Sequence, residues 1–266
     1  MTFHLAAFSE SIGTSVTNSQ LNALTDDILN VSNNNFLPDI DLDLVFAASM
    51  GVDLTNSRIV SPSNRQITLP YILPQNEALN ADVATGYSKY QDLTYNPMRL
   101  RGLEEFGVEV TDSSASGTTI TTSIVGLQPS FEPAPRGTCY TMRGTSTTTH
   151  STTAWTTLAI TWADTLPEGS YTVVGLNVIS DNPIAARCIF EGQTWRPGAL
   201  CTSDEDNWAG PLFFNPNGAL GAWGTFKAWA PPQIQVLSSA ADTSATAYLQ
   251  FVRTGYSPHL SLASRV

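Results

Sequence analysis

Few acidic, histidine or serine residues in this chain have the spacing that catalysis requires. The tripeptide Asp242-Thr243-Ser244 approximates the Asp-Thr-Gly of aspartic proteases, but it lacks the glycine and has no second copy. A turn before a final strand, in which the Asp and Ser side chains bond to nearby backbone, is the plainer interpretation. The sequence also contains no G-x-S-x-G nucleophile elbow, glycine-rich phosphate loop or dinucleotide fingerprint. The chain is therefore predicted not to be an enzyme.

One acidic run could bind a metal ion, and it consists of Asp204, Glu205 and Asp206. Hard oxygen ligands on a loop suit Ca²⁺, and Asn207 could add a carbonyl oxygen. The run lacks the glycine and downstream glutamate of an EF-hand loop, so a solvated acidic loop is the alternative. The histidines, His4, His150 and His259, have no partner at zinc-site spacing, and His150 is predicted to be solvated. A site built from residues distant in sequence stays open, but no cofactor is predicted.

Aromatic residues are concentrated between residues 195 and 229. They are Trp195, Trp208, Phe213, Phe214, Trp223 and Trp229. Three interpretations remain open: a lid packed on the protein's own core, a contact between subunits with aromatic anchors, and a platform on which sugars stack. As interface candidates we select Trp195, Trp208, Phe213 and Phe214.

Composition indicates a globular β-protein that contacts other proteins rather than nucleic acid. The chain has 266 residues and is 42% hydrophobic, which suffices for a sizeable core. Only 13% of residues are charged and the net charge is −11, with no Lys or Arg in the first thirty residues. Because phosphate-binding surfaces need clustered basic residues, direct nucleic-acid binding is not expected. A surface rich in Ser and Thr suits strands and self-contact.

The cysteines and the N-terminal segment argue against a disulfide-stabilised secreted protein and against a membrane protein. Cys139, Cys188 and Cys201 form an odd set, so we expect buried small hydrophobic residues rather than a disulfide framework. The start, MTFHLAAFSESIG, lacks the positive region and long apolar run of a signal peptide. No window approaches the roughly 18 apolar residues of a transmembrane helix.

The strongest strand signal is a hairpin between residues 166 and 200. Tyr171–Ser180 is apolar on both faces, and Ile184–Phe190 alternates after the break at Asp181-Asn182-Pro183. A strand that is apolar on both faces lies inside a layered body or against another subunit. From residue 104 onward we expect about eight or nine short strands, as in a sandwich or jelly roll.

The first hundred residues have a different pattern. Thr17–Val31 has apolar residues at helical spacing and is predicted to be an amphipathic helix. Leu42–Met50 is a short helix or a strand, and residues 58–96 are extended segments interrupted by prolines. We therefore predict an N-terminal arm over residues 1–103 and a jelly-roll sandwich over residues 104–266. The fold class is all-β: a jelly-roll β-sandwich, single or else double, with a partly irregular and partly helical extension.

Two blocks of the sequence resemble the later part of jelly-roll major capsid proteins of small icosahedral viruses or bacteriophages. They are LPEGSYTVVGLNVIS…AARCIFEGQTWRPGAL and NPNGALGAWGTFKAWAPPQIQVLSSAADTSATAYLQFVR, which lie between residues 166 and 253. Residues 58–110 share the resemblance loosely. The acidic N-terminus departs from the basic arms of many RNA-virus coats, and this puts genome contacts in doubt.

The resemblance implies a structural virion protein that self-assembles into an icosahedral capsid shell and has no catalytic residues. Its expected partners are copies of itself and other virion proteins. Its expected location is the virion, after synthesis in the host cytoplasm without a signal peptide. The alternative hypothesis is a β-sandwich module that binds carbohydrate or a receptor, as in a spike or adhesin.

Overall fold

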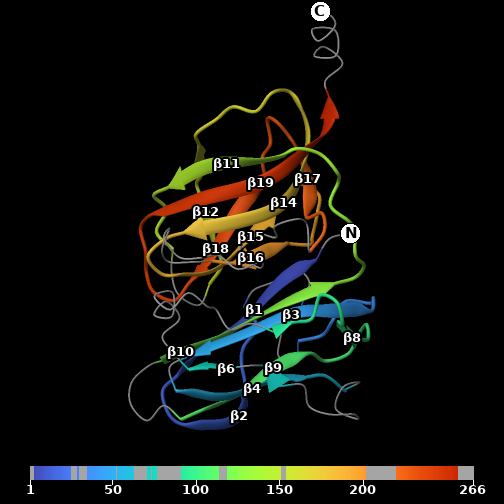
Figure 1. The fold of residues 1–266 in the computed structure, drawn as a ribbon. Helices are drawn as coiled ribbons and strands as arrows, with labels where there is room; N and C mark the ends of the chain where they lie inside the picture. The colour runs from blue at the N-terminus through green and yellow to red at the C-terminus, as the bar shows by residue number, and fades with distance from the viewer. Residues whose placement is uncertain are drawn as a thin grey trace, which may run out of the picture.

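In a computed structural model of the protein, the elements formed by the described residues are β-strands. The structure describes residues 3–24, 29, 35–51, 53–62, 71–72, 74–76, 91–113, 119–150, 154–201 and 220–256. The strands form four sheets, two from each half of the chain (Figure 1). The all-β class predicted from the sequence is confirmed.

The N-terminal half forms a sandwich of two sheets. Its strands are β1 (His4–Ile12), β2 (Val16–Gln20), β3 (Leu42–Gly51), β4 (Leu54–Val60), β5 (Tyr71–Ile72), β6 (Pro74–Asn76), β7 (Gln91–Asp92), β8 (Met98–Leu100), β9 (Gly107–Asp112) and β10 (Thr119–Gln128). The inner N-terminal sheet has the order β1-β10-β3-β6, with β7 and β8 also pairing with β3. The outer N-terminal sheet has the order β2-β9-β4-β5.

The C-terminal half repeats this plan. Its strands are β11 (Cys139–Ser146), β12 (Thr156–Leu158), β13 (Thr161–Trp162), β14 (Gly169–Ile179), β15 (Pro183–Ile189), β16 (Gly198–Leu200), β17 (Gly224–Lys227), β18 (Gln233–Ser238) and β19 (Ala245–Tyr256). The outer C-terminal sheet has the order β13-β11-β19-β14-β17, and the inner C-terminal sheet has the order β12-β18-β15-β16.

The two halves share the strand order of a jelly roll. In each half the first strand pairs with the last strand, and the last strand pairs with the central strand of the same sheet: β1-β10-β3 in one half and β11-β19-β14 in the other. The facing sheets, β2-β9-β4-β5 and β12-β18-β15-β16, also correspond strand by strand. This wrapping of two Greek keys defines the jelly roll. The sequence favoured a single jelly roll with an N-terminal extension and gave a double jelly roll as the alternative; the strand order shows the double form.

The predicted boundary at residues 103 and 104 is therefore wrong. β9 and β10 lie beyond it in sequence, yet they pair with β1, β2, β3 and β4 and complete the N-terminal sandwich. Residues 1–103 are no arm, because their described strands supply most of that sandwich. The connection between the two jelly rolls runs from Pro129 to Thr138, between β10 and β11.

The predicted helix over Thr17–Val31 is also wrong where the structure describes it. Residues 17–20 belong to β2, and Asn18 has a φ of 50°. Leu21 and Leu24 are buried against the sandwich, so their helical spacing reflects two inward contacts of an extended segment. Residues 25–28 and 30–31 lie outside the described part of the chain. Leu42–Met50, which was open between helix and strand, is β3.

The four sheets stack as layers, with the two inner sheets in the middle (Figure 1). Alternate residues of β1 show why: Leu5 and Ala7 join the cluster of the C-terminal sandwich, whereas Ala6 and Phe8 face the outer N-terminal sheet. A strand with apolar side chains on both faces must be covered on both sides. The joint between the jelly rolls is therefore a packed core.

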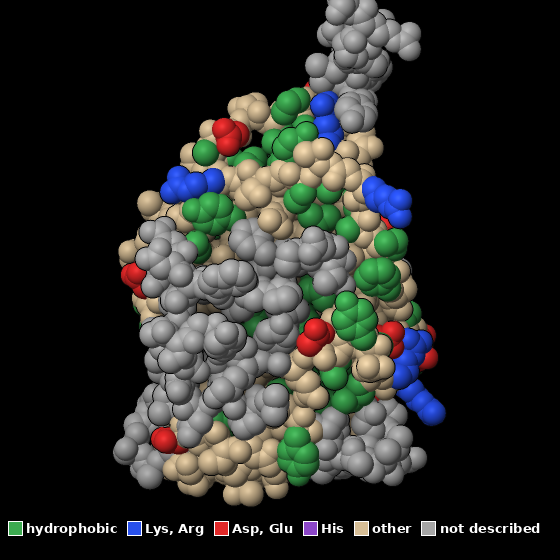
Figure 2. Space-filling view, in the orientation of Figure 1, with side chains coloured by type: hydrophobic (Ala, Val, Ile, Leu, Met, Phe, Trp, Pro, Cys, Tyr) green, Lys and Arg blue, Asp and Glu red, His purple; other side chains and the backbone are tan. Residues whose placement is uncertain are grey.

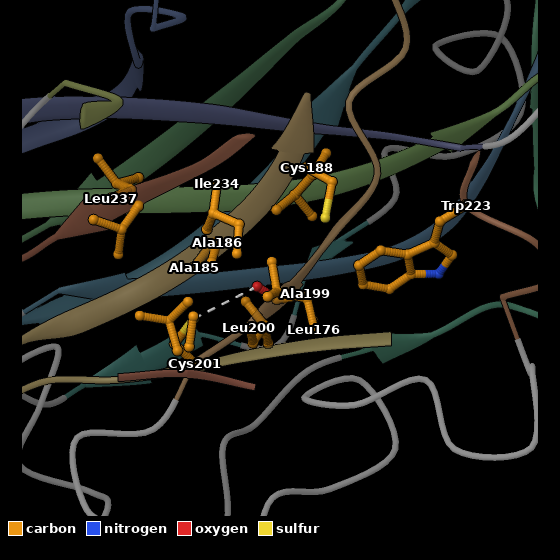
Figure 3. Packing of buried hydrophobic residues seen from close by; sticks show 14 of the residues in the cluster. Leu176, Ala185, Ala186, Cys188, Ala199, Leu200, Cys201, Trp223, Ile234 and Leu237 are labelled. Carbon is orange, nitrogen blue, oxygen red and sulfur yellow. Dashed lines mark hydrogen bonds between the residues drawn. The ribbon is translucent and has the colours of Figure 1, made fainter. Parts of the chain in front are cut away.

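Large side chains and hydrogen bonds fill this joint. Trp223 is fully buried, and its ring meets Phe3 edge to face with 5.4 Å between centroids. The Leu5 amide donates to the Arg196 carbonyl at 3.0 Å. Figure 3 shows Trp223 beside the packed side chains of β15, β16 and β18, among them Cys188. These buried side chains and hydrogen bonds hold the two jelly rolls against each other.

The core of the N-terminal sandwich is partly hydroxylic. The Ser49 hydroxyl on β3 lies 2.7 Å from the Ser57 hydroxyl on β4 and 2.6 Å from the Ser123 hydroxyl on β10. All three residues are fully buried. The hydroxyl groups satisfy one another and link the inner to the outer N-terminal sheet, as buried polar groups require.

Gly126 offers a direct test of how tightly the inner N-terminal sheet is packed. A Cβ at this position would lie 2.3 Å from the ring of Phe46 on the neighbouring strand. We expect Gly126→Ala to lower the free energy of unfolding by about 1–3 kcal/mol, measured by urea denaturation. Gly13→Ala is the matched control because nothing lies within 4 Å of its Cβ position. Equal midpoints for the two variants would contradict the packing described.

Candidate functional site

A concave surface runs along β17, the edge strand of the outer C-terminal sheet. Two hollows of about 600 Å³ and about 560 Å³ lie side by side there. They share Phe190, Glu191 and Thr225 as common walls. We call the two hollows together the edge groove. Among the described strands, β17 pairs only with β14 and is therefore an edge strand.

Two exposed aromatic residues lie at the edge groove. Trp229 lines the second hollow and is 72% exposed. Phe131 is 58% exposed and directly precedes Glu132, which lines the first hollow. The Glu132 carbonyl accepts a hydrogen bond from the Ala222 amide at 2.8 Å, which fixes this segment against the start of β17. Exposed aromatic side chains beside a hollow are the usual anchors of protein contacts.

Charge is sparse around this surface. Glu132, Glu191 and Lys227 are the charged residues that line the edge groove, and the Lys227 ammonium donates to the Ser170 hydroxyl. Figure 2 shows few and scattered charged side chains on the face that it presents. Burying such a surface against another protein costs little desolvation of ions.

The interface residues predicted from the sequence are not found at the edge groove among the described residues, apart from Trp195, which lines its first hollow but is nearly buried. Trp195 is only 8% exposed, and its ring meets the buried His4 ring with 6.1 Å between centroids. Its contacts are therefore within the chain, between the two jelly rolls, which corrects its selection as a surface anchor. Sequence reasoning did not select Trp229 or Phe131, although their exposure marks them; local sequence does not distinguish an exposed from a buried tryptophan. The remaining predicted residues lie outside the described ranges: Asp204, Glu205, Asp206, Trp208, Phe213 and Phe214.

His150, Ser180 and Asp242 form a buried polar cluster at one end of the C-terminal sandwich. The exposed fraction is 0% for His150 and 5% for Asp242, so the prediction of a solvated histidine is wrong. His150 Nε2 lies 3.0 Å from the Ser180 hydroxyl and 3.6 Å from Asp242 Oδ2, and the Ser180 hydroxyl donates to that oxygen. Three connections that are distant in sequence bring these residues together.

The cluster lacks the geometry of a hydrolase triad. In a triad the histidine uses one ring nitrogen for the serine and the other for the carboxylate. Here Ser180 and Asp242 both approach Nε2, whereas Nδ1 lies 3.0 Å from the Thr148 carbonyl. The Ser180 side chain points its proton to the carboxylate and is buried from substrate. This arrangement differs from the relay that activates a serine nucleophile.

The cysteines differ in environment and are all free thiols. Burial raises the pKa of Cys188 and raises that of Cys201 to about 12, as expected of core residues. Cys139 is exposed, which corrects its predicted burial. Within the described ranges, no group of three or more His, Cys, Asp and Glu residues could hold a metal ion. The same part of the chain has no helix of the length and hydrophobicity that crossing a bilayer requires.

No protein-family model and no curated protein matches the chain. Two solved structures are similar over nearly its whole length. The major capsid protein P2 of bacteriophage PM2 shows 11% identity over 95% of this chain and 98% of that chain, with a TM-score of 0.27. The STIV MCP, a major capsid protein, shows 9% identity over 98% of this chain and 99% of that chain, also with a TM-score of 0.27. At this level of similarity neither match bears on function, and the fold is assigned from strand order alone.

Proposed function

We propose that the protein is a structural subunit of a virion and that copies of it assemble into an icosahedral capsid shell. The observation that carries this proposal is the repeated jelly roll, with both copies packed into one block through a filled joint. Jelly rolls serve as shell units, lectins and cupins, so the fold alone does not decide. Because large buried residues such as Trp223 fill the joint, the two jelly rolls keep a fixed relative position, and this favours a structural role for the protein.

The surface supports the same proposal. The edge groove presents exposed aromatic residues, an edge strand of the described sheet and few ions, which suit contact with further copies. The net charge of −11 favours protein partners over the genome, and other virion proteins are proposed as the second class of partner. Purified protein should form particles visible by electron microscopy, and a stable monomer at high concentration would overturn the proposal.

Replacing Trp229 by alanine should impair assembly while leaving the fold intact. Loss of a central aromatic anchor commonly costs about 2 kcal/mol or more per contact, which is roughly a thirtyfold rise in the dissociation constant. Sedimentation velocity over a concentration series measures this change. Tyr95→Ala is the matched control, because Tyr95 is 89% exposed and does not line the edge groove. If both variants assemble like the parent chain, the edge groove is not a contact between copies.

The alternative function, a carbohydrate- or receptor-binding module, is favoured by the same tryptophan. An exposed indole ring beside polar groups such as Glu191 and Gln233 is a surface on which a sugar ring could stack. Titration with a glycan panel should then quench the total tryptophan fluorescence of the parent chain but leave that of Trp229→Ala unchanged. Quenching without particle formation would favour this module over the shell subunit.

A further inference from the structure

A third hollow, of about 270 Å³, lies in the C-terminal jelly roll and shares no lining residue with the edge groove. Its floor is the inward face of the outer C-terminal sheet, where Met142, Tyr171 and Phe251 are buried core residues. Its rim is the connection from β13 to β14, which contributes Asp164 and the half-buried Leu166. We call this hollow, with these five residues and Tyr140 in its lining, the aromatic pocket.

The rings of the aromatic pocket are grouped around Phe251. Tyr140 stacks on it with 6.2 Å between ring centroids, and Tyr171 meets it edge to face at 5.3 Å. Strand register explains the grouping: Tyr140 pairs with Phe251 and Tyr171 pairs with Arg253, so these side chains share one face of the sheet. Tyr140 is nevertheless 50% exposed. The aromatic wall therefore continues from the core of the sandwich to the solvent.

Hydrogen bonds from the sheet hold the rim of the aromatic pocket in place. The Tyr171 hydroxyl donates to the Pro167 carbonyl at 2.5 Å, and Arg253 Nη2 donates to the Glu168 carbonyl at 2.8 Å. Both acceptors belong to the connection from β13 to β14, so the floor and the rim are tied together. Because the walls are already in position, a ligand that enters pays little for ordering them.

From this geometry we propose that the aromatic pocket binds a small uncharged aromatic molecule with one hydrogen-bond donor, as in a phenol or an indole. A volume of about 270 Å³ equals roughly nine water volumes, which matches a molecule of about nine heavy atoms such as indole. Aromatic walls favour an aromatic ring through stacked and edge-to-face contacts. Asp164, exposed at the rim, offers an acceptor for the donor and disfavours a ligand carboxylate. The inference concerns the single chain and is independent of the proposed shell function.

Fluorine-19 NMR of 5-fluoroindole, titrated with the protein, tests the proposal whether or not the chain assembles. The probe signal should broaden, with a dissociation constant on the order of 1 mM or below, as a preformed pocket gives a ligand of this size. Tyr140→Ala should weaken binding by about threefold to tenfold, because it removes one stacking wall. Leu166→Trp should abolish binding by filling the pocket. Tyr95→Ala, which removes an exposed tyrosine outside the pocket, is the control that should keep the parent affinity.

Carbon-13 methyl NMR of the methionine-labelled parent chain locates the site even where a variant fails to fold. 5-Fluoroindole should shift the Met142 methyl signal through its ring current and leave Met50 and Met98, which do not line the pocket, in place. An unshifted Met142 signal at millimolar probe, or unchanged binding in a folded Leu166→Trp variant, would overturn the proposal. Equal affinity for 1,1-difluorocyclohexane, a non-aromatic probe of similar size, would overturn the assignment of an aromatic ligand.

Discussion

Replacing Trp223 by alanine is expected to lower the free energy of unfolding by about 3–5 kcal/mol. The side chain is fully buried in the joint between the two jelly rolls and packs edge to face against Phe3. Truncation removes its apolar contacts, leaves a cavity that the surrounding sheets cannot close, and removes an aromatic pair worth about 1 kcal/mol. Urea denaturation followed by far-UV circular dichroism measures the change.

Trp229→Ala is the matched control for this prediction, because it makes the same chemical change at a residue that is 72% exposed. Its free energy of unfolding should stay within about 0.5 kcal/mol of the parent value. The two variants thus separate stability from assembly: Trp223→Ala unfolds easily, and Trp229→Ala folds normally but associates weakly. Similar losses of stability in both variants would show that the joint is not packed around Trp223.

Replacing Arg187 by alanine is expected to have a comparable effect through polar contacts. Arg187 is fully buried on β15, and its guanidinium carbon lies 4.2 Å from the centroid of the Trp155 ring. Its Nε donates to Gln235 at 2.9 Å, and its Nη1 donates to the Leu5 carbonyl on β1 at 3.3 Å. Loss of the side chain leaves buried acceptors and a cavity, together about 3–5 kcal/mol.

The same substitution should also weaken the coupling between the jelly rolls. The bond from Arg187 to Leu5 crosses the joint, so Arg187→Ala should broaden or split the thermal transition observed by calorimetry. Arg136→Ala is the control, since Arg136 is an exposed residue of the connection between the jelly rolls. Arg187→Lys should fall between the two, because lysine keeps the charge but lacks the planar donor fork. A single sharp transition at the parent temperature in Arg187→Ala would refute this role.

Sequence patterns predicted the C-terminal jelly roll well because its hairpin carries local signals. The turn at Asp181-Asn182-Pro183 separates two runs that became β14 and β15, with bounds displaced by one or two residues. The expectation that β14 is covered on both faces follows from its continuous apolar run, and its central residues are buried.

The N-terminal jelly roll was missed because its core does not follow the usual hydrophobic alternation. Ser49, Ser57 and Ser123 are buried as a hydroxyl network, which resembles a polar loop in sequence. β3 is apolar on both faces because the second jelly roll covers it, so it showed no period of two. Leu21 and Leu24 added a helical spacing by coincidence. Only the pairing partners distinguish these strands from an irregular arm.

The polar cluster could not be predicted from sequence for a different reason. His150, Ser180 and Asp242 lie in connections separated by 30 and 62 residues, and each is surrounded by ordinary turn residues. Their meeting depends on the jelly-roll order, which places these connections at one end of the sandwich. The exposure of Trp229 could not be predicted for the same reason, since it depends on the position of the turn that follows β17.

The pairing of first and last strands sets the order in which the chain can fold. β1 pairs with β10, from His4 with Leu127 to Ile12 with Thr119, and β11 pairs with β19 in the same way. Such distant pairings make folding slow, because long loops must close before the contacts that reward them form. During synthesis β1 has to wait for β10, and the newly completed inner N-terminal sheet then exposes an apolar face.

That face stays uncovered until the inner C-terminal sheet arrives more than a hundred residues later. A nascent or partly folded chain therefore presents a hydrophobic sheet that another nascent chain could cover in its place. The apolar face that packs the two jelly rolls together in the folded protein thus makes the nascent chain prone to aggregation. Expression yield is expected to depend on slow synthesis, low temperature or a chaperone that shields the inner N-terminal sheet.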